Sequence, residues 1–422
     1  MALLNIQQEY SVDHSIKSYE YHAFQPISGT QLNSAGEITI RIENQSAFFH
    51  PKKSFLMIEG VLKKATNYAD TDLVTFVNNG ILHCFSNIRY HLSGSEIESL
   101  YEPGYASTLL GLARVSHKAC GLVSCWYPDE VNGTAAVSEP GFVKRHDYII
   151  KQSTPKGTFR FVIPLEHILG FADDYTKVIT GMSHSLTLVR KSDDNDAIFR
   201  TAGAGAGHVA LKNISWVMPK VEPNDEMRFK LFKVIESKEM LNVAFRMRQA
   251  ATTTIPQVQT FTWRLGCRAA PERPRYIIVG LQKERGGNQE KNNSIFDNCG
   301  VVSMYCMMNE VRYPVLDYTA NFTTNEIGNV YKDFIDFNSK FDGIDPCIAA
   351  PTIDPISFKN LHTLFVFDVS KQDDRVKSSI VDVTLEMKFD AVLNVDTTAH
   401  AIIISDRMIK LQSDGSNLTV VY

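Results

Sequence analysis

The stretch that decides the fold is FVNNGILHCFSNIRYHLSGSEIESLY, residues 76–101. Its turn-forming start, Asn78-Asn79-Gly80, leads into a run in which apolar residues occupy every second position from Ile88 to Leu92. A strand with one buried face has this period of two. The tight turn Ser93-Gly94-Ser95 follows, and the chain then starts back. We therefore predict a strand and hairpin introduced by a loop or a one-turn helix.

The same pattern returns in the second half of the chain, at residues 296–318, FDNCGVVSMYCMMNEVRYPVLDY. Phe and Asn-x-Gly again precede an alternating run. A second pair of similar segments occurs in the same order: Leu186-Thr187-Leu188 followed by His208 to Leu211, and Thr384-Leu385-Glu386 followed by His400 to Ile403. Two repeated features in one order favour an internal duplication.

Length and composition describe an ordinary soluble globular protein. The chain has 422 residues, of which 44% are hydrophobic and 21% charged, so we expect about two domains. A net charge of −4 argues against a strongly basic nucleic-acid binder and predicts no direct sequence-specific binding of nucleic acid. The N-terminus lacks the pattern of a secretory signal, and no span reaches the ~20 apolar residues of a transmembrane segment.

The seven cysteines are odd in number and contain no CxxC pair. We interpret them as reduced thiols of a protein made in a cytosol-like compartment. Without a secretory route, the six Asn-x-Ser/Thr sites are interpreted as chance occurrences. The cysteines are Cys84, Cys120, Cys125, Cys267, Cys299, Cys306 and Cys347.

Each half contains seven or eight short β-branched and aromatic runs, joined by turns and a few long loops. This pattern predicts an all-β sandwich, and the eight-stranded antiparallel jelly roll fits the strand count. We expect two tandem jelly-roll barrels with a few short helices in loops, one helix at residues 104–115, and a long loop at 116–156. The predicted division is an extended N-terminal arm at 1–35, a first jelly roll at 36–220 and a second at 221–422.

A search for chemistry yields candidates that all have a simpler structural interpretation. Gly203-Ala204-Gly205-Ala206-Gly207 matches no phosphate-binding motif and is expected to be a connector. Cys120 near His117 has no orienting acid. The acidic pairs at Asp173-Asp174 and Asp193 to Asp196 lack EF-hand spacing and are expected in exposed turns. No His-x-His supports a cupin-like metal enzyme, so we expect His184, His208 and His400 to be solvated or hydrogen-bonded structural residues.

Aromatic residues leave one alternative open. Trp216 and Trp263 lie in apolar runs and are expected in the core, whereas Trp126-Tyr127 in the long loop could stack on a sugar or base. We therefore predict no catalytic, cofactor-binding or metal-binding residues, and no cofactor. The alternative to a structural protein is a β-sandwich carbohydrate- or ligand-binding protein, for which Trp126-Tyr127 would be the site.

Three segments resemble the double jelly-roll major capsid proteins of DNA viruses, with the adintovirus and polinton-like members the most similar. FVNNGILHCFSNIRYHLSGSEIESLYEPG, FRFVIPLEHILGFADD and SHSLTLVRK look like the Asn-rich loop and hairpin, the Pro-stopped strand and the returning strand of the first barrel. The sequence departs from some large-virus members in lacking a full double glycine at Gly94. The lineage also includes adenovirus and large DNA virus capsid proteins.

The resemblance implies a non-enzymatic major capsid protein. Three chains would form a homotrimeric, pseudo-hexagonal capsomer that tiles an icosahedral shell. Residues 116–156, with 282–293 and 342–359, would form outer towers and a clasp, and the N-terminal arm would lie beneath. The implied partners are neighbouring capsomers and a penton or minor capsid protein. The implied location is the virion, after synthesis in the host cytoplasm, with the nucleus left open as the place of assembly.

Overall fold

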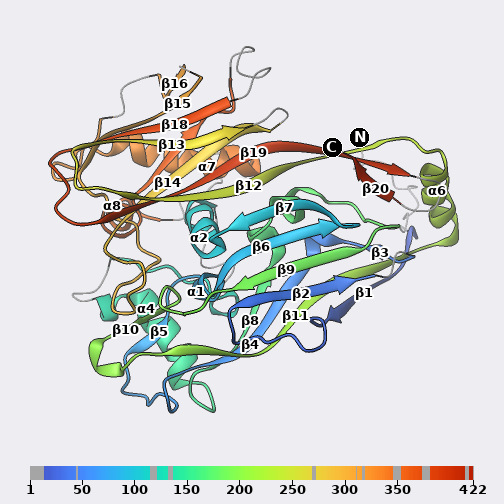
Figure 1. Ribbon diagram of the computed structural model, residues 1–422, viewed down its shortest axis with the longest axis horizontal. Helices are drawn as coiled ribbons and strands as arrows, with labels where there is room; N and C mark the ends of the chain where they lie inside the picture. The colour runs from blue at the N-terminus through green and yellow to red at the C-terminus, as the bar shows by residue number, and fades with distance from the viewer. Residues whose placement is uncertain are drawn as a thin grey trace, which may run out of the picture.

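The computed structural model describes residues 14–43, 46–114, 121–131, 136–268, 272–309, 311–315, 319–345, 353–372, 381–413 and 418–421. It consists of two antiparallel β-barrels, one above the other in Figure 1. The prediction of two tandem jelly rolls is confirmed.

The first barrel is built from two four-stranded arrays. One has the order β1-β11-β4-β8, and the other β2-β9-β6-β7. Their bounds are β1 (Ile16–Phe24), β2 (Gly36–Ile42), β4 (Phe55–Lys63), β6 (Phe85–Leu92), β7 (Ser95–Tyr101), β8 (Thr158–Pro164), β9 (His184–Arg190) and β11 (His208–Pro223). The short strands β3 (Phe48–Phe49), β5 (Val74–Phe76) and β10 (Ile198–Arg200) complete it.

The second barrel repeats this topology. Its arrays have the orders β12-β19-β14-β17 and β13-β18-β15-β16. The bounds are β12 (Leu241–Ile255), β13 (Thr260–Arg268), β14 (Arg273–Lys283), β15 (Val301–Met308), β16 (Val311–Tyr313), β17 (Leu364–Asp368), β18 (Val381–Phe389) and β19 (Thr397–Ser413), with β20 (Leu418–Val421) added beside β19. We number the eight principal strands of each barrel from one to eight along the chain, leaving out β3, β5, β10 and β20. In both barrels the strand order of the first array is then 1-8-3-6, and the strand order of the second array is 2-7-4-5.

The internal duplication expected from the sequence is therefore confirmed strand by strand. The stretch at 76–101 contains β6, and its repeat contains β15, which has the same place in the second barrel. β9 and β18 are both seventh strands, and β11 and β19 both eighth. Strict alternation marks the buried faces, as in β18, where every second side chain from Val381 to Phe389 is buried.

The organising stretch folds as its sequence predicts. α1 (Gly80–His83) is a single turn that precedes the β6–β7 hairpin. Gly80 permits a close approach, because a Cβ there would lie 2.6 Å from the carbonyl oxygen of Ala197. The Asn79 amide donates to Ser107 Oγ at 2.7 Å, and Asn78 Oδ1 accepts the backbone N–H of Tyr127 at 2.8 Å. The Asn-rich turn thus holds the connections that follow it.

The expected helix at 104–115 is α2 (Pro103–Arg114), buried from Pro103 to Ala113. A helix buried on all sides belongs in a protein interior, and Figure 1 shows α2 between the two barrels. Helices are longer than we expected, since α6 (Asp225–Glu236) and α7 (Gly328–Asp342) each span three or more turns. Among the described residues, the other α-helices are α4 (Pro140–His146), α5 (Gly170–Asp174) and α8 (Pro355–Leu361).

Three sequence-based expectations need correction. Within the expected arm at 1–35, Ile16–Phe24 is β1, hydrogen-bonded along β11; residues 1–13 lie outside the described part. The pattern hid β1 because seven of its nine side chains are exposed, so no alternation appears. The loop expected at 116–156 contains α4 and several shorter helical turns. β11 runs on to Pro223, past the boundary expected at 220/221, and α6 separates it from β12.

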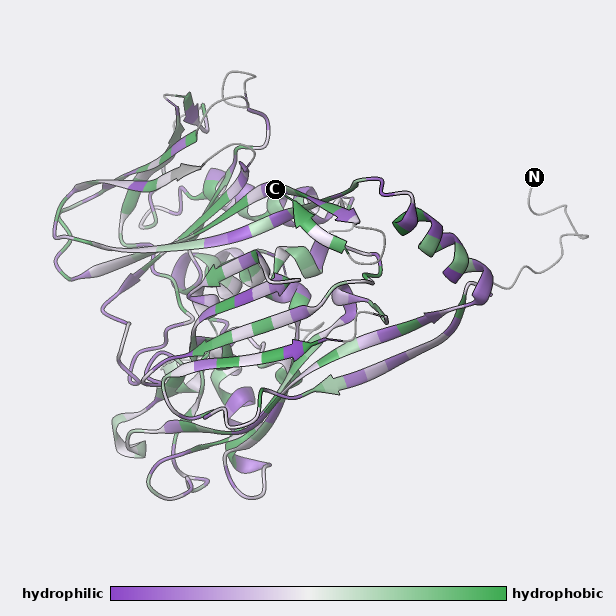
Figure 2. Cartoon of the chain, turned by 45° about the vertical axis from the view of Figure 1, so that its right-hand side comes forward, coloured by the Kyte–Doolittle hydropathy of each residue, from purple (hydrophilic) through white to green (hydrophobic). Residues whose placement is uncertain are grey.

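The long connections gather at one end of the molecule. In Figure 1, α4, β5 and β10 lie at the left end of the first barrel, whereas α6 lies at the right end. Figure 2 shows α6 standing out from the body, with green and purple residues mixed around its surface. The two ends of the molecule are therefore different in construction.

Candidate functional site

The two barrels meet along the free edge of β12, and this junction is the candidate functional site. In the described chain β12 pairs only with β19, so the N–H groups of alternate residues face outward without a strand partner. The carboxylate of Glu98 on β7 accepts the N–H of Arg248 at 2.8 Å. The carboxylate of Asp174 on α5 accepts the N–H of Arg246 at 2.7 Å. Two carboxylates of the first barrel thus replace a neighbouring strand.

Glu98 also fixes the start of α5. Its two carboxylate oxygens accept the N–H groups of Gly170 at 3.0 Å and Phe171 at 2.9 Å. One buried carboxylate therefore binds backbone donors from both barrels. The approach needs a glycine, because a Cβ on Gly170 would lie 1.8 Å from the carbonyl oxygen of Arg246.

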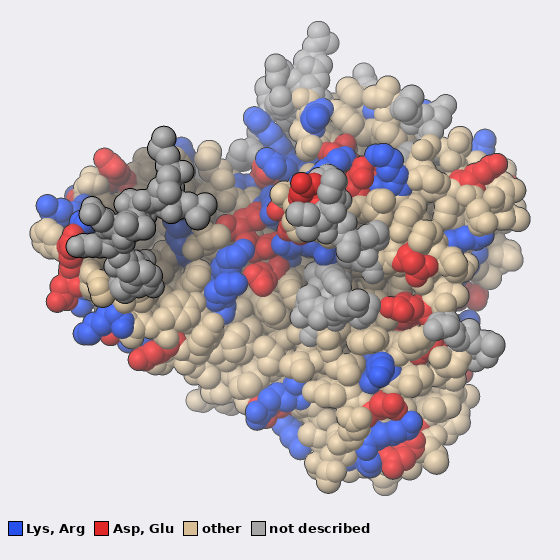
Figure 3. Space-filling view, turned by 180° about the vertical axis from the view of Figure 1, so that it is seen from behind, with Lys and Arg blue, Asp and Glu red and all other residues tan. Residues whose placement is uncertain are grey.

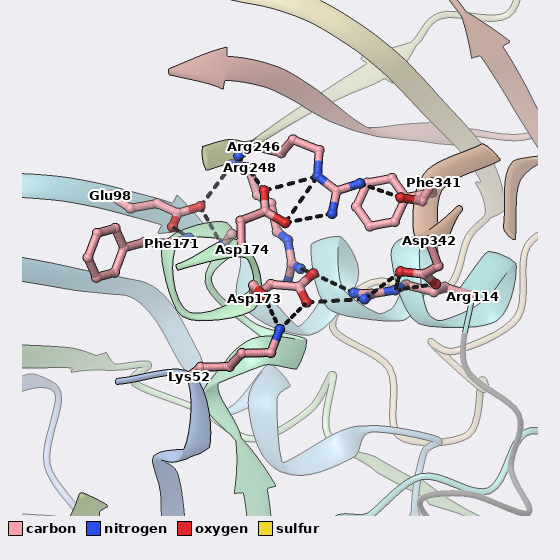
Figure 4. A network of polar contacts seen from close by, with 11 residues as sticks. Lys52, Glu98, Arg114, Phe171, Asp173, Asp174, Arg246, Arg248, Phe341 and Asp342 are labelled. Carbon is pink, nitrogen blue, oxygen red and sulfur yellow. Dashed lines mark hydrogen bonds and ion pairs between the residues drawn. The ribbon is translucent and has the colours of Figure 1, made fainter. Parts of the chain in front are cut away.

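A network of ion pairs surrounds these backbone contacts (Figure 4). Asp173 lies at its centre, with Arg114 at 2.5 Å and the fully buried Arg248 at 2.7 Å. Lys52 donates to the Asp173 carbonyl oxygen. Arg114 reaches across to Asp342 at 2.7 Å, and Asp174 pairs with Arg246 at 2.6 Å. The four cations and the four carboxylates, Glu98 included, balance in charge, as buried charges must.

The pKa values of the two central carboxyls shift in opposite directions. Burial alone would raise the pKa of Asp173, but Arg248, Arg114 and Lys52 together outweigh it and hold that pKa below its usual 3.8. Burial dominates at Glu98 and raises its pKa above the usual 4.5, against the pull of Arg248 and three backbone N–H groups. The folded protein thus stabilises the ionised form of Asp173, whereas burial destabilises the ionised form of Glu98.

Acid is expected to weaken the junction through Asp173. A carboxyl whose pKa is lower in the folded state contributes stability above its unfolded pKa and loses it as the pH falls through the folded value. For Asp173 this loss begins near pH 3.8 and continues below it. The pKa of Glu98 is raised in the folded state, so its protonation has the opposite effect: it stabilises the folded protein as the pH falls towards 4.5.

The measurement is the midpoint of urea-induced unfolding at pH 7 and at steps from pH 5 down to pH 3. The difference between wild type and Asp173→Asn should shrink as the pH falls below 3.8. A difference that stays constant over this range would show that Asp173 holds no lowered pKa in the folded protein.

The middle of the junction is apolar and aromatic. α2 lies against β14 and β19, and a Cβ at Gly280 would meet Leu109 at 2.8 Å. Tyr105 of α2 stacks on His400 of β19 with ring centroids 4.0 Å apart. The ring of His83 contacts Tyr105 edge-on at 4.6 Å. Burial lowers the pKa of both histidines to about 3, so these rings pack as neutral groups at pH 7.

A second polar cluster closes the other end of the junction. The buried Arg145 pairs with Asp129 at 3.0 Å. From the second barrel, Asn292 donates to Asp129 Oδ2 at 2.7 Å, and a ring nitrogen of His362 lies 2.8 Å from its carbonyl oxygen. Nearby, Gln289 accepts the N–H of Gly207 at 2.9 Å. Contacts of this kind join the loops of the two barrels into one surface.

The acidic pairs correct one of our expectations. We placed Asp173-Asp174 and Asp193 to Asp196 in exposed turns, but Asp173 and Asp194 are buried. Asp173 belongs to the junction, and Asp194 pairs with Arg190 at 2.5 Å. Asp173 was misjudged because its partners, Arg114 of α2 and Arg248 of β12, come from distant parts of the chain, whereas the partner of Asp194 lies only four residues before it.

The remaining candidates lie in structural surroundings. His184 is buried with Nδ1 2.8 Å from the Tyr90 hydroxyl, His400 lies 3.1 Å from Thr252 Oγ1, and His208 is exposed. The glycine run includes the short turn η7 (Ala202–Ala204) before β11. Trp216 and Trp263 are buried as expected. Cys120 and His117 lie outside the described residues.

Trp126, the residue left open for stacking, is 5% exposed. Its ring lies against α2, where a Cβ on Gly111 would come within 2.2 Å of it. The indole therefore presents no free face to a ligand. In the described ranges, no group of His, Cys, Asp or Glu residues is arranged to hold a metal ion, and no helix is long and apolar enough to cross a membrane.

Sequence reasoning missed the residues of the junction. From the sequence we assigned no role to Glu98, Arg114, Arg246 or Arg248, because the groups that they bind lie far away in the sequence. A signal was present in β12. Arg246 and Arg248 lie two residues apart among apolar residues, so both side chains lie on the same face of the strand. Two arginines on one side of a buried strand require compensating carboxylates.

Comparison with known proteins agrees with this architecture. The sequence matches the family model of the double jelly roll-like domain over residues 136–409. No curated protein matches it. A chain in the structure of the Sputnik virophage is similar with 11% identity and a TM-score of 0.63, over 99% of this chain and 91% of that chain.

Two further solved structures are similar over nearly the whole chain. The mavirus major capsid protein has 13% identity and a TM-score of 0.57, covering 99% of this chain and 92% of that chain. The Faustovirus major capsid protein has 10% identity and a TM-score of 0.54, covering 96% and 92%. At such low identity these likenesses concern the fold.

Proposed function

Because the chain belongs to the double jelly roll-like domain family, we propose that it is a major capsid protein, a structural subunit without catalytic activity. The observation that carries the proposal is the pair of matching barrels joined by a buried network of ion pairs and hydrogen bonds. The same fold occurs in the mavirus and Faustovirus major capsid proteins. A capsid subunit must present the same edges to every neighbour, and a buried junction between its two barrels supports this.

We further propose that three chains form a homotrimeric, pseudo-hexagonal capsomer that tiles an icosahedral shell. Within one chain, the contact between barrels is heterologous, because the β7 side of the first meets the β12 side of the second. A heterologous contact closes into a ring when its rotation divides a full turn. Six barrels from three chains would satisfy this with one repeated kind of contact.

The two ends of the molecule suit the two sides of a shell. The long connections containing α4 and the second-barrel loop at 282–293 meet at one end, which we assign to the outer surface. α6 and β1 lie towards the other end (Figure 1). Figure 3 shows positive and negative residues interspersed over the back of the molecule, so no strong single-sign field on this face opposes close packing.

The partners proposed on this basis are neighbouring capsomers and a penton or minor capsid protein, and the proposed location is the virion. We propose a division into two jelly rolls at α6. The carbohydrate-binding alternative depended on Trp126-Tyr127, and the burial of Trp126 removes the observation that favoured it.

Native mass tests the proposal. The purified chain should elute as a trimer of three times 47.4 kDa, or as larger particles, when measured by light scattering after size exclusion. Negative-stain images should show pseudo-hexagonal plates. A chain that stays monomeric at micromolar and higher concentrations would contradict the capsid proposal.

A further inference from the structure

Two histidines are buried in the middle of the junction, one from each barrel. His83 on α1 is 1% exposed, and His400 on β19 is 4% exposed. Tyr105 of α2 joins them, because its ring stacks on His400 and meets His83 edge-on. Burial raises the pKa of Tyr105 well above its usual 10.0, so this ring is neutral at pH 7. The histidine pair, defined here as His83 and His400, thus lies in an aromatic layer between the barrels.

The closed junction has no place for the protonated form of His83. A Cβ on Gly104 would lie 2.4 Å from Cγ of the ring, so the packing on this side leaves no room for water. Among the described residues, neither ring nitrogen of His83 has a hydrogen-bond partner. An imidazolium has two N–H donors, and both need an acceptor when they are buried. His400 has one polar neighbour in β12, with Nδ1 3.1 Å from Thr252 Oγ1.

The charged groups that face the histidine pair belong to the first barrel. Lys191 donates to Glu102 at 2.6 Å and to Asp196 at 3.3 Å. Asp196 attracts a proton to both histidines, whereas Lys191 repels it. The contacts from the second barrel, with Thr252 and Phe296, carry no charge. Burial therefore outweighs the carboxylate and keeps both imidazoles neutral in the closed junction.

We propose that the histidine pair makes the junction an acid-sensitive switch, which holds the two barrels together at neutral pH and lets them separate in mild acid. Separation admits water to both rings, and each regains the pKa near 6.5 of an exposed histidine. The pKa of each ring in the closed junction is about 3. Because the pKa is lower in the closed state, the closed junction loses stability as the pH falls from about 6.5 towards 3.

This range separates the histidine pair from the carboxyl groups of the ion-pair network. The loss expected from Asp173 begins only near pH 3.8, and protonation of Glu98 favours the folded state. In a capsid subunit, the switch would loosen the tile in an acidic compartment. That consequence rests on the proposed function, whereas the switch itself is a property of a single chain.

Hydrogen exchange of the full chain, followed by mass spectrometry, tests the proposal. The signal is the exchange of the β12 and α2 amides at pH 7 and pH 5, corrected for the effect of pH on the intrinsic rate. The ratio of open to closed junction should rise roughly 25-fold for each histidine that becomes exposed, and on the order of 600-fold for both. Exchange of β18, away from the junction, should rise less.

Replacing the histidines by neutral rings should remove this response. In the double variant His83→Phe with His400→Phe, the junction should open nearly equally at pH 7 and pH 5, because no ring can take up a proton. The ion-pair network is the same in both proteins, so their difference reports the histidine pair. A second double variant, His83→Gln with His400→Gln, serves if the first does not fold, as checked by circular dichroism.

The matched control is His184→Phe. His184 is equally buried, and burial lowers its pKa to about 3 as well, but it lies within the first barrel beside the Tyr90 hydroxyl. This variant should keep the full pH response of the junction amides. The proposal is overturned if the folded double variants respond to pH as the wild type does, or if the wild-type junction exchanges at the same corrected rate at both pH values. Neither result would alter the native mass on which the capsid proposal is tested.

Discussion

Replacing Asp173 by Asn is expected to destabilise the protein by roughly 3–5 kcal/mol, the loss typical when one partner of a buried ion pair is removed. Arg248 is fully buried, and Asp173 is the carboxylate that pairs with its guanidinium, at 2.7 Å. Arg114 would keep Asp342, but the buried guanidinium of Arg248 would lose its direct ion-pair partner. The asparagine keeps the shape of the side chain, so the loss reports the charge.

Urea-induced unfolding at pH 7, followed by far-UV circular dichroism at fixed protein concentration, measures this effect. Asp406→Asn is the matched control, because it breaks an ion pair with Arg275 in which both side chains are more than 40% exposed. Exposed pairs contribute at most about 1 kcal/mol. If the two variants shift the unfolding midpoint equally, the buried network does not stabilise the junction.

Gly170→Ala is expected to cost about 3 kcal/mol or more, at the upper end of the range for overpacked sites. The added Cβ would lie 1.8 Å from the carbonyl oxygen and 2.8 Å from the carbonyl carbon of Arg246. Both sides of the clash are backbone, so no side chain can move aside. α5 and β12 must separate, which lengthens the hydrogen bonds from Glu98 and Asp174 to the second barrel.

The control for this substitution is Gly203→Ala, where an added Cβ meets no heavy atom within 4 Å and the change should stay within about 0.5 kcal/mol. Thermal unfolding and limited proteolysis of the two variants under identical conditions compare them. If Gly170→Ala were as stable as the wild type, the barrels would be free to shift, and the close approach of Gly170 to Arg246 would not contribute to stability.

The strands that the sequence predicted well are those with one solvent-exposed face and one buried face. The Ile88–Leu92 run and Val381–Phe389 alternate strictly, because their outward residues are polar. β1 was missed for the opposite reason: seven of its nine residues are exposed, so no dry face marked it. The duplication was recognisable because two pairs of segments kept both their residues and their order.

The junction could not be predicted from local patterns. Glu98 binds the backbone of Arg248, which lies 150 positions away, and Arg114 pairs with Asp342 over 228 positions. No periodicity connects residues so far apart, so nothing in the local sequence identifies these charges as partners. The exposed-turn interpretation of Asp173 failed for the same reason, since its partners are supplied by α2, β12 and the turn at Lys52.

The capped edge of β12 has a consequence for biosynthesis. A ribosome completes the first barrel, with Glu98 and Asp174 in place, before Arg246 and Arg248 leave the exit tunnel, and N-terminal units generally fold first. The nascent strand therefore meets carboxylates that accept its N–H groups at once, and it is shielded from pairing with strands of other nascent chains on the same messenger. This order of synthesis protects the open edge of β12 against aggregation.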